Sequence, residues 1–328
     1  MKMTLLYFVC LMVFVTAVPA QQTARERAIE LYKQGKFDES INLLETYFKN
    51  KVLQTDAEAW TFLGLSYFNL MDYKNARKSL EAAVKYQPQN ATFQGNLAYF
   101  YLYTAQMGKA QRAAKEALRI DPRNVDASYV LGAGELWQGD LDEASKIADN
   151  ILAIDIGFPK AYLLKSDVLM ATLGKRVSGG SAIRDELDLL RQNVEVLEGG
   201  LDKSQKRPGS EQVETYLEAA RAFYAHFSKE PPISAAPEAG VTPFRFISKP
   251  KAVYTDNARA AGISGAVRLV VLLGANGQVL HILKLKGIGF GLDEQAIRAA
   301  QQIRFEPKKK DGIPVSTVVT IEYTFSVY

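Results

Sequence analysis

The chain has 328 residues, of which 48% are hydrophobic and 23% charged, and its formal net charge is +4. This length accommodates two domains with separate cores, and the charge balance gives no support to a nucleic-acid-binding protein, which usually shows a strong basic excess. One cysteine and two histidines exclude a disulfide within the chain and argue against zinc sites and cysteine–histidine catalysis.

Residues 1–20 have the layout of a secretory signal. Lys2 precedes an apolar run from Leu5 to Val18, and small residues follow up to Ala20. The run is shorter than the roughly 20 residues of a membrane-spanning helix. We therefore expect cleavage after Ala20 and a mature chain outside the cytoplasm. An uncleaved membrane anchor is the alternative.

A 34-residue period organises residues 21–158. Pro88 and Pro122 are 34 residues apart, and each follows an alanine-rich stretch. Small residues recur at fixed positions, such as Gly64 and Ala76 in the second period, where they let two helices approach closely. Proline ends the second helix because it has no amide hydrogen. The period predicts four helix–turn–helix repeats.

The second period carries the fullest pattern: Trp60, Leu63, Gly64, Tyr67, Tyr73, Ala76, Leu80, Ala83 and Pro88. This pattern resembles the tetratricopeptide repeat family, whose concave face binds peptides through the first helix of each repeat. The resemblance implies that the groove includes Phe68, Tyr99, Tyr103, Tyr129 and Trp137. Aromatic residues are enriched in cores as well as interfaces, so packing between repeats remains an equal alternative.

Residues 159–228 are expected to form a degenerate fifth repeat and capping helices. Lys175–Ser181 is predicted to be a flexible loop, with helices near 182–198 and 210–228 after it. The last repeat of a solenoid must present a polar outer face, which we expect here. Residues 229–243 contain four prolines and few apolar residues, which indicates a linker.

The pattern changes from helical to alternating in residues 244–328. The predicted elements are a short helix Asp256–Ala261, strands Val267–Leu273 and Val279–Lys286, a helix Leu292–Ile303 and a final strand Val315–Tyr328. Asn276-Gly277 favours a tight hairpin between the first two strands. The expected fold is α-β-β-α-β, with both helices on one face of a three-stranded sheet.

Short motifs in this segment support a second resemblance. They include Pro250 with Tyr254, Gly262–Gly265, Arg304–Pro307 and Asp311–Val315. In order and spacing, residues 249–328 resemble the C-terminal domain of the TonB energy-transducer family. That family's domain captures a short peptide of an outer-membrane transporter as an added strand beside its last strand.

The resemblance implies two groups of peptide-binding residues. The edge strand would supply Val318, Val319, Thr320, Ile321, Glu322 and Tyr323, and the segment before the first helix would supply Lys249, Pro250 and Tyr254. An exposed strand edge offers unpaired amides and carbonyls to an incoming chain. The alternative is an edge covered by the chain itself or by a second copy.

Charge is unevenly distributed along the chain. From Arg245 onward there are 12 basic and 6 acidic residues, so this segment would be steered toward acidic partners and anionic surfaces. Lys308-Lys309-Lys310 is expected in the turn before the last strand, most simply as a solvated loop.

Together these patterns predict a multidomain chain. An all-α tetratricopeptide solenoid would be followed by a small α+β domain like the TonB C-terminal domain. The expected segments are 1–20 signal peptide or anchor, 21–158 repeats, 159–228 degenerate repeat and caps, 229–243 linker and 244–328 C-terminal domain.

The expected function is a non-catalytic periplasmic adaptor that needs no cofactor or metal and binds proteins, not nucleic acid. Its partners would be an outer-membrane transporter or another envelope protein. A membrane-anchored energy transducer for outer-membrane transport is the alternative. The sequence leaves the oligomeric state open.

Overall fold

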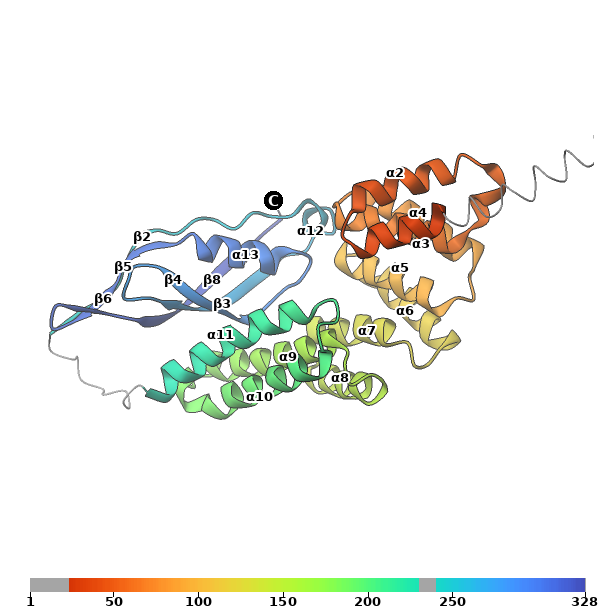
Figure 1. The fold of residues 1–328 in the computed structure, drawn as a ribbon. Helices are drawn as coiled ribbons and strands as arrows, with labels where there is room; N and C mark the ends of the chain where they lie inside the picture. Colours follow the sequence, from red (N-terminus) through yellow and green to blue (C-terminus); the bar gives the residue numbers. More distant parts are fainter. Residues whose placement is uncertain (1–23, 230–239, 328) are drawn as a thin grey trace, which may run out of the picture. The chain divides into compact units, whose positions relative to one another are not determined.

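The computed structural model describes residues 24–229 and 240–327 (Figure 1). The predicted signal segment 1–20, most of the predicted linker 229–243 and Tyr328 lie outside the described residues. The chain divides into two compact units, one up to Tyr101 together with Arg112–Ala127, the other Leu102–Gln111 together with Ser128 onward. No helix among the described residues is both long enough and apolar enough to cross a membrane.

The predicted period appears as regularly spaced helices. The first helices of successive repeats, α3, α5, α7 and α9, begin at Ala57, Ala91, Val125 and Pro159, which are 34 residues apart. Residues 24–33 are also helical. The remaining elements of this part are α2 (Phe37–Tyr47), η1 (Lys51–Thr55), α3 (Ala57–Asn69), α4 (Tyr73–Tyr86), α5 (Ala91–Tyr103), α6 (Met107–Ile120), α7 (Val125–Gln138) and α8 (Leu141–Ile154).

Short polar side chains start most of these helices. Asp56, Asp72, Asn90, Asn124 and Asp140 each accept a hydrogen bond from the backbone N–H three residues later, at 2.9–3.2 Å. Such caps satisfy one of the amides that a helix start leaves without a partner. Three of them, at 56, 90 and 124, repeat with the same 34-residue spacing. The caps therefore help to fix where each repeat begins.

Small residues bring the paired helices close together, as the sequence predicts. Ala76 and Ala83 on α4 are buried. A Cβ atom added to Gly64 on α3 would lie only 2.7 Å from Cγ of Leu80 on α4. Gly64 therefore sits where no larger side chain fits without displacing Leu80.

Residues 159–229 form three long helices. These are α9 (Pro159–Ser178), α10 (Leu187–Ser204), preceded by η2 (Ile183–Glu186), and α11 (Ser210–Lys229). The predicted loop Lys175–Ser181 is wrong in its first half, because α9 continues to Ser178. Basic residues favour the last turn of a helix, and Arg176 is also held there by Glu186, with Nη1 and Oε2 2.6 Å apart.

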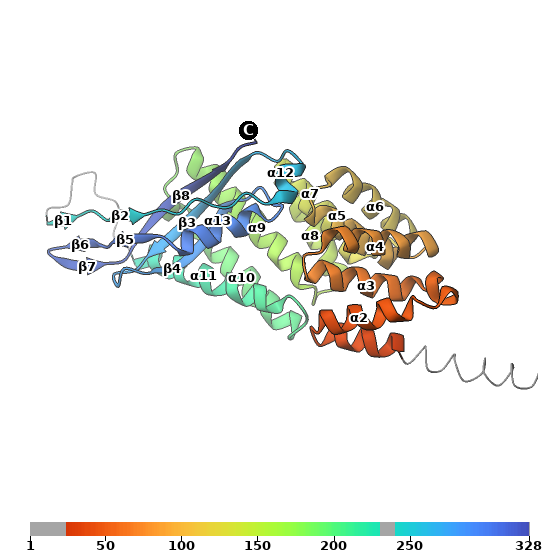
Figure 2. The same ribbon diagram turned by 90° about the horizontal axis from the view of Figure 1, so that it is seen from above.

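A three-stranded antiparallel sheet is the centre of the C-terminal domain (Figures 1 and 2). Its order is β4 (Val279–Lys286), β3 (Gly265–Leu273), β8 (Thr317–Phe325). In the register, Val271 of β3 lies opposite Ile282 of β4 and Val319 of β8. With α12 (Asp256–Ala260) and α13 (Leu292–Gln301), these strands confirm the predicted order α-β-β-α-β.

Helices cover both faces of this sheet, whereas the sequence predicted helices on one. Residues at alternate positions of β3 join different hydrophobic clusters. Leu269, Val271 and Leu273 pack with α13. Val270 and Leu272 pack with Leu173 of α9 and Phe223 of α11. The physical reason is the apolar run of β3, because a strand that is apolar at successive positions needs cover on both sides.

The same packing overturns the expected polar outer face of the helices after residue 159. Leu173 and Phe223 are fully buried against the sheet. A Cβ on Gly174 of α9 would lie 2.7 Å from the backbone oxygen of Leu285 on β4. The absence of a side chain at Gly174 thus lets α9 lie directly on β4.

Short strands extend the C-terminal domain beyond the main sheet. β2 (Arg245–Ser248) pairs with β5 (Arg304–Glu306), and β1 (Val241–Thr242), β6 (Lys308–Lys310) and β7 (Ile313–Val315) form a small sheet in the order β1-β6-β7. Lys308–Lys310 is thus a strand, not the predicted turn. The predicted final strand Val315–Tyr328 corresponds to the shorter β8 (Thr317–Phe325), and Val315 belongs to β7. Asp311 and Gly312 have φ of 49° and 80°, which gives the tight turn that lets β6 and β7 pair.

Candidate functional site

β8 is an edge strand of the main sheet. All nine of its residues lie opposite residues of β3, from Thr317 opposite Leu273 to Phe325 opposite Gly265. Among the described residues, no strand pairs with its other side. The six residues predicted to bind a peptide at the edge, Val318, Val319, Thr320, Ile321, Glu322 and Tyr323, therefore all lie on β8.

The side chains of β8 alternate between two environments. Ile321, Tyr323 and Phe325 are buried, whereas Thr320 and Glu322 are exposed. Burial raises the pKa of Tyr323 to about 12, so its hydroxyl is neutral at physiological pH. The strand is anchored through one set of side chains and leaves the other set accessible.

The second predicted contact segment reaches the same strand. Lys249 Nζ donates to the backbone oxygen of Glu322 at 3.3 Å and lies 5.2 Å from the centre of the Tyr323 ring. The ring of Tyr254 is 5.7 Å from that of Phe325. The structure thus brings Lys249 and Tyr254 to β8, with Pro250 half-buried in the segment between them.

The bond from Lys249 identifies which residues of β8 direct their backbone outward. In an antiparallel pair, the N–H and C=O groups of one residue point to the same side, and the side alternates along the strand. Because the carbonyl of Glu322 meets Lys249 outside the sheet, the outward set comprises Val318, Thr320, Glu322 and Thr324. The sequence could not give this alternation, since it depends on the register with β3.

A buried ion cluster at β4 was not predicted from the sequence. Lys284 of β4 lies between two carboxylates, with Nζ 3.2 Å from Oδ1 of Asp167 on α9 and 3.2 Å from Oδ2 of Asp293 on α13. The side chains of Lys284, Asp167 and Asp293 are 17%, 21% and 10% exposed. The position of Lys284 between the apolar Leu283 and Leu285 was the available signal, because a buried charge needs a partner.

Electrostatics in this cluster follow from burial and proximity. Burial opposes the charge of Lys284, but Asp167 and Asp293 outweigh it and hold the pKa of Lys284 well above its ordinary value. Burial raises the pKa of Asp167, although Lys284 acts in the opposite direction. Asp293 also accepts hydrogen bonds from the backbone N–H groups of Ile288 and Gly289 at 2.8 and 3.1 Å. The amides of this glycine-rich loop are thus occupied by a side chain of the protein itself.

The predicted groove residues Phe68 and Tyr99 belong to the first unit. Their ring centres are 6.1 Å apart, and Phe68 also contacts the rings of Tyr73 and Phe100. All four rings therefore contribute to packing between neighbouring helices. This favours the packing alternative for Phe68.

The other three predicted groove residues, Tyr103, Tyr129 and Trp137, belong to the second unit. The ammonium group of Lys160 lies 5.5 Å from the ring centre of the half-buried Tyr129. Trp137 contacts Phe290 edge-on at 5.7 Å and is still 45% exposed. Tyr103 is also exposed. Trp137 and Tyr103 therefore keep accessible ring surface.

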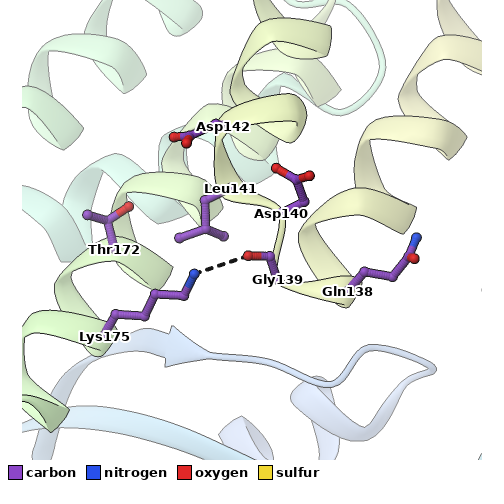
Figure 3. Close-up of a pocket in the computed structure, with 7 residues that line it drawn as sticks. All are labelled: Gln138, Gly139, Asp140, Leu141, Asp142, Thr172 and Lys175. Carbon is purple, nitrogen blue, oxygen red and sulfur yellow. Dashed lines mark hydrogen bonds between the residues drawn. The ribbon is translucent and has the colours of Figure 1, made fainter.

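A shallow hollow of about 500 Å³ lies between the turn after α7 and the end of α9 (Figure 3). Two of its charged side chains have structural roles, since Asp140 caps α8 and Lys175 donates to the carbonyl of Gly139 at 3.0 Å. Within the described ranges, no group of three or more histidine, cysteine, aspartate or glutamate side chains could hold a metal ion.

Comparison with protein families matches two separate segments of the chain. Residues 57–90 and 91–124 each match the tetratricopeptide repeat, and residues 250–327 match the Gram-negative bacterial TonB protein C-terminal domain. The matched C-terminal segment contains β8 and Tyr254.

Curated relatives match over short segments. Serine/threonine-protein phosphatase 5 of Rattus norvegicus is 28% identical over 136 residues, 39% of this chain and 27% of that protein. The protein of the same name from Homo sapiens is 28% identical over 88 residues, 27% of this chain and 18% of that protein. The chain therefore spans about a quarter or less of the length of these relatives.

Solved structures of repeat proteins are similar to parts of the chain. A thermophilic TPR protein of Thermus thermophilus is 18% identical, with a TM-score of 0.47 over 63% of this chain and 98% of that chain. Pseudomonas aeruginosa pilF is 17% identical, with a TM-score of 0.44 over 65% and 98%. The family matches establish that this chain combines tetratricopeptide repeats at residues 57–124 with a TonB C-terminal domain at residues 250–327.

Proposed function

We propose that this protein is a non-catalytic adaptor of the Gram-negative cell envelope. Its TonB C-terminal domain captures an extended segment of an outer-membrane transporter or another envelope protein, and its repeats hold a second protein. The observation that carries the proposal is β8, which bonds to β3 along one side and meets no other strand among the described residues.

Strand addition at β8 uses the backbone groups that the sheet leaves outside. The outward amides and carbonyls of Thr320 and Glu322 can pair with a peptide, which gains main-chain hydrogen bonds and places alternate side chains against the domain. Lys249 occupies the Glu322 carbonyl in the free protein. An incoming strand therefore displaces the Lys249 ammonium group from the edge.

The repeats supply the surface for the second partner. Tyr103 and Trp137 expose aromatic surface on the first helices of the third and fourth repeats. Exposed aromatic side chains are enriched at protein interfaces. The aromatic character of these positions favours a partner with apolar side chains over an acidic one.

A membrane-anchored energy transducer is the second candidate. It is favoured by the match of residues 250–327 to TonB proteins and by the apolar run Leu5–Val18. The N-terminus of the protein isolated from its native envelope separates the two. Gln21 as the first residue in a soluble extract supports the adaptor, and intact Met1 in the inner-membrane fraction supports the transducer.

Peptide N-methylation tests strand addition directly. A seven-residue peptide selected from a display library on the full-length protein serves as the probe, and each of its amides is methylated in turn. Strand addition predicts that methylation at alternate residues abolishes binding, whereas methylation at the residues between them changes it little. Equal sensitivity at all positions, or at none, would reject capture at a strand edge.

Substitutions at Thr320 locate the binding edge. Thr320→Pro removes an outward amide, which an edge strand tolerates, and we expect at least a tenfold loss of affinity for the selected peptide. Thr320→Val is the matched control, because it keeps the amide and changes only the side chain. If Thr320→Pro binds the peptide as tightly as the native protein does, the peptide binds elsewhere.

A further inference from the structure

The small sheet β1-β6-β7 forms a ribbon beyond the end of the main sheet, as both views show (Figures 1 and 2). The tight turn at Asp311 and Gly312 joins β6 to β7, and the N–H of Asp311 donates to the carbonyl of Gly240 beside β1 at 2.9 Å. The ribbon is therefore a built structure and not a solvated loop.

Lysines and aliphatic residues share one face of this ribbon. Residues that are direct partners in neighbouring strands point to the same face, and the register places Lys310 opposite both Val241 and Ile313, and Lys308 opposite Val315. One face thus carries Val241, Lys308, Lys310, Ile313 and Val315. Ile313 is 68% exposed, so this face leaves a large aliphatic side chain in water.

The charge of the ribbon is one-sided. The three strands contain three lysines and no acidic residue, and Asp311 in the turn is the one acid between β6 and β7. A stable protein interface buries about 800 Å² on each partner, which eight strand residues hardly supply. A lipid surface requires less area, because lysines attract anionic headgroups while an apolar side chain enters the boundary of the acyl chains.

From this face we infer that the β1-β6-β7 ribbon binds an anionic phospholipid surface. Ile313 enters the headgroup region, and Lys308 and Lys310 lie beside the lipid phosphates. The site shares no residue with the β8 edge, so lipid binding and peptide capture succeed or fail independently.

A tryptophan placed in the ribbon tests this inference in the full-length protein. In a background that carries Trp60→Phe and Trp137→Phe, Ile313→Trp is mixed with phosphatidylglycerol–phosphatidylcholine vesicles that contain brominated lipids, which quench a tryptophan only near the acyl chains. Ile156→Trp is the matched control, because Ile156 is also an exposed isoleucine, 60% accessible, but lies on the helical side of the same unit. Both variants carry the N-terminal apolar segment, so any contribution from it is common to them.

We expect strong quenching for Ile313→Trp with anionic vesicles and little with pure phosphatidylcholine. Changing Lys308 and Lys310 to glutamine should weaken this binding by about fivefold for each lysine. Equal quenching of the tryptophans at positions 313 and 156 overturns the inference, and so does equal quenching of Ile313→Trp by neutral and anionic vesicles. Binding of poly-glutamate without any vesicle quenching overturns it too, since the ribbon would then be a site for acidic polypeptides.

Discussion

Replacement of Lys284 by methionine tests whether the ion cluster holds the sheet on the helices. The substitution keeps the length of the side chain and removes the cation between Asp167 and Asp293. Both carboxylates stay largely buried, and Asp167 on α9 then faces the sheet without its counter-ion. We expect the unit that contains α9, β4 and α13 to lose stability.

The structure sets the size of this loss. Removing one member of a buried ion pair costs about 3–5 kcal/mol, because the remaining charge is left uncompensated. The side chains are 10–21% exposed, and solvent screening places the expected loss near the lower end, at about 3 kcal/mol. With a urea dependence of about 2 kcal/mol per molar, the unfolding midpoint falls by about 1.5 M.

Trp137 provides the assay, because its ring contacts Phe290 beside α13. In a Trp60→Phe background, its fluorescence reports urea unfolding of this unit alone. Lys286→Met is the matched control, since Lys286 is an exposed lysine on the same strand. A loss below about 1 kcal/mol for Lys284→Met, or an equal loss for the control, would refute the reasoning.

A double variant and alkaline pH extend this test. Asp167→Leu combined with Lys284→Met should recover most of the lost stability, since apolar residues often replace a buried pair without cost.

The folded protein holds the Lys284 proton more tightly than the unfolded chain, in which the pKa of this lysine is about 10.5. The stabilisation is therefore complete below pH 10.5 and is lost as the pH rises through the higher folded pKa. The stability gap between the native protein and Lys284→Met should narrow in that range.

Two further substitutions test packing and capping. Gly174→Ala should lower the free energy of unfolding by about 2 kcal/mol, because its Cβ would meet the Leu285 oxygen at 2.7 Å. Gly199→Ala is the control and should stabilise α10, because nothing lies within 4 Å of its Cβ. Both are measured by urea denaturation, and equal effects would contradict the packing. Asp56→Ala should lower the free energy of unfolding by about 1–3 kcal/mol, because Asp56 caps α3 and accepts a hydrogen bond from the Tyr47 hydroxyl at 2.6 Å. Thermal melts measure this loss, and an unchanged melting temperature would show that neither bond contributes.

The local parts of the fold could be predicted from the sequence, and the long-range contacts could not. The 34-residue spacing gave the starts of the repeat helices, and alternation gave β4 with its observed bounds Val279–Lys286. The contact of Asp167 with Lys284 joins residues 117 positions apart, and no local pattern specifies such a pairing. The unbroken apolar run of β3 indicates that helices cover both faces of the sheet. Such runs are more typical of parallel strands, which are buried on both faces.

The candidate site divides in the same way. The family resemblance located the edge strand and Lys249, but the bond from Lys249 to the Glu322 carbonyl depends on the register of β8 and on the path of the chain before α12. Lys308–Lys310 was misplaced because lysine has a low strand propensity, and here pairing with β1 and β7 overrides that preference.

The common 34-residue spacing of the helix starts determines where repeats could be added to or removed from this chain. The helix α9 starts at Pro159, in step with Ala57, Ala91 and Val125, and it packs against β4 and β3. Duplication or deletion of one 34-residue unit before residue 159 leaves α9 and its contacts with the sheet unaltered. Insertion after residue 159 would separate α9 from β4. Because Ala105 and Trp137 also pack against the C-terminal domain, the number of repeats is free to vary only before α5 and is fixed after Pro159.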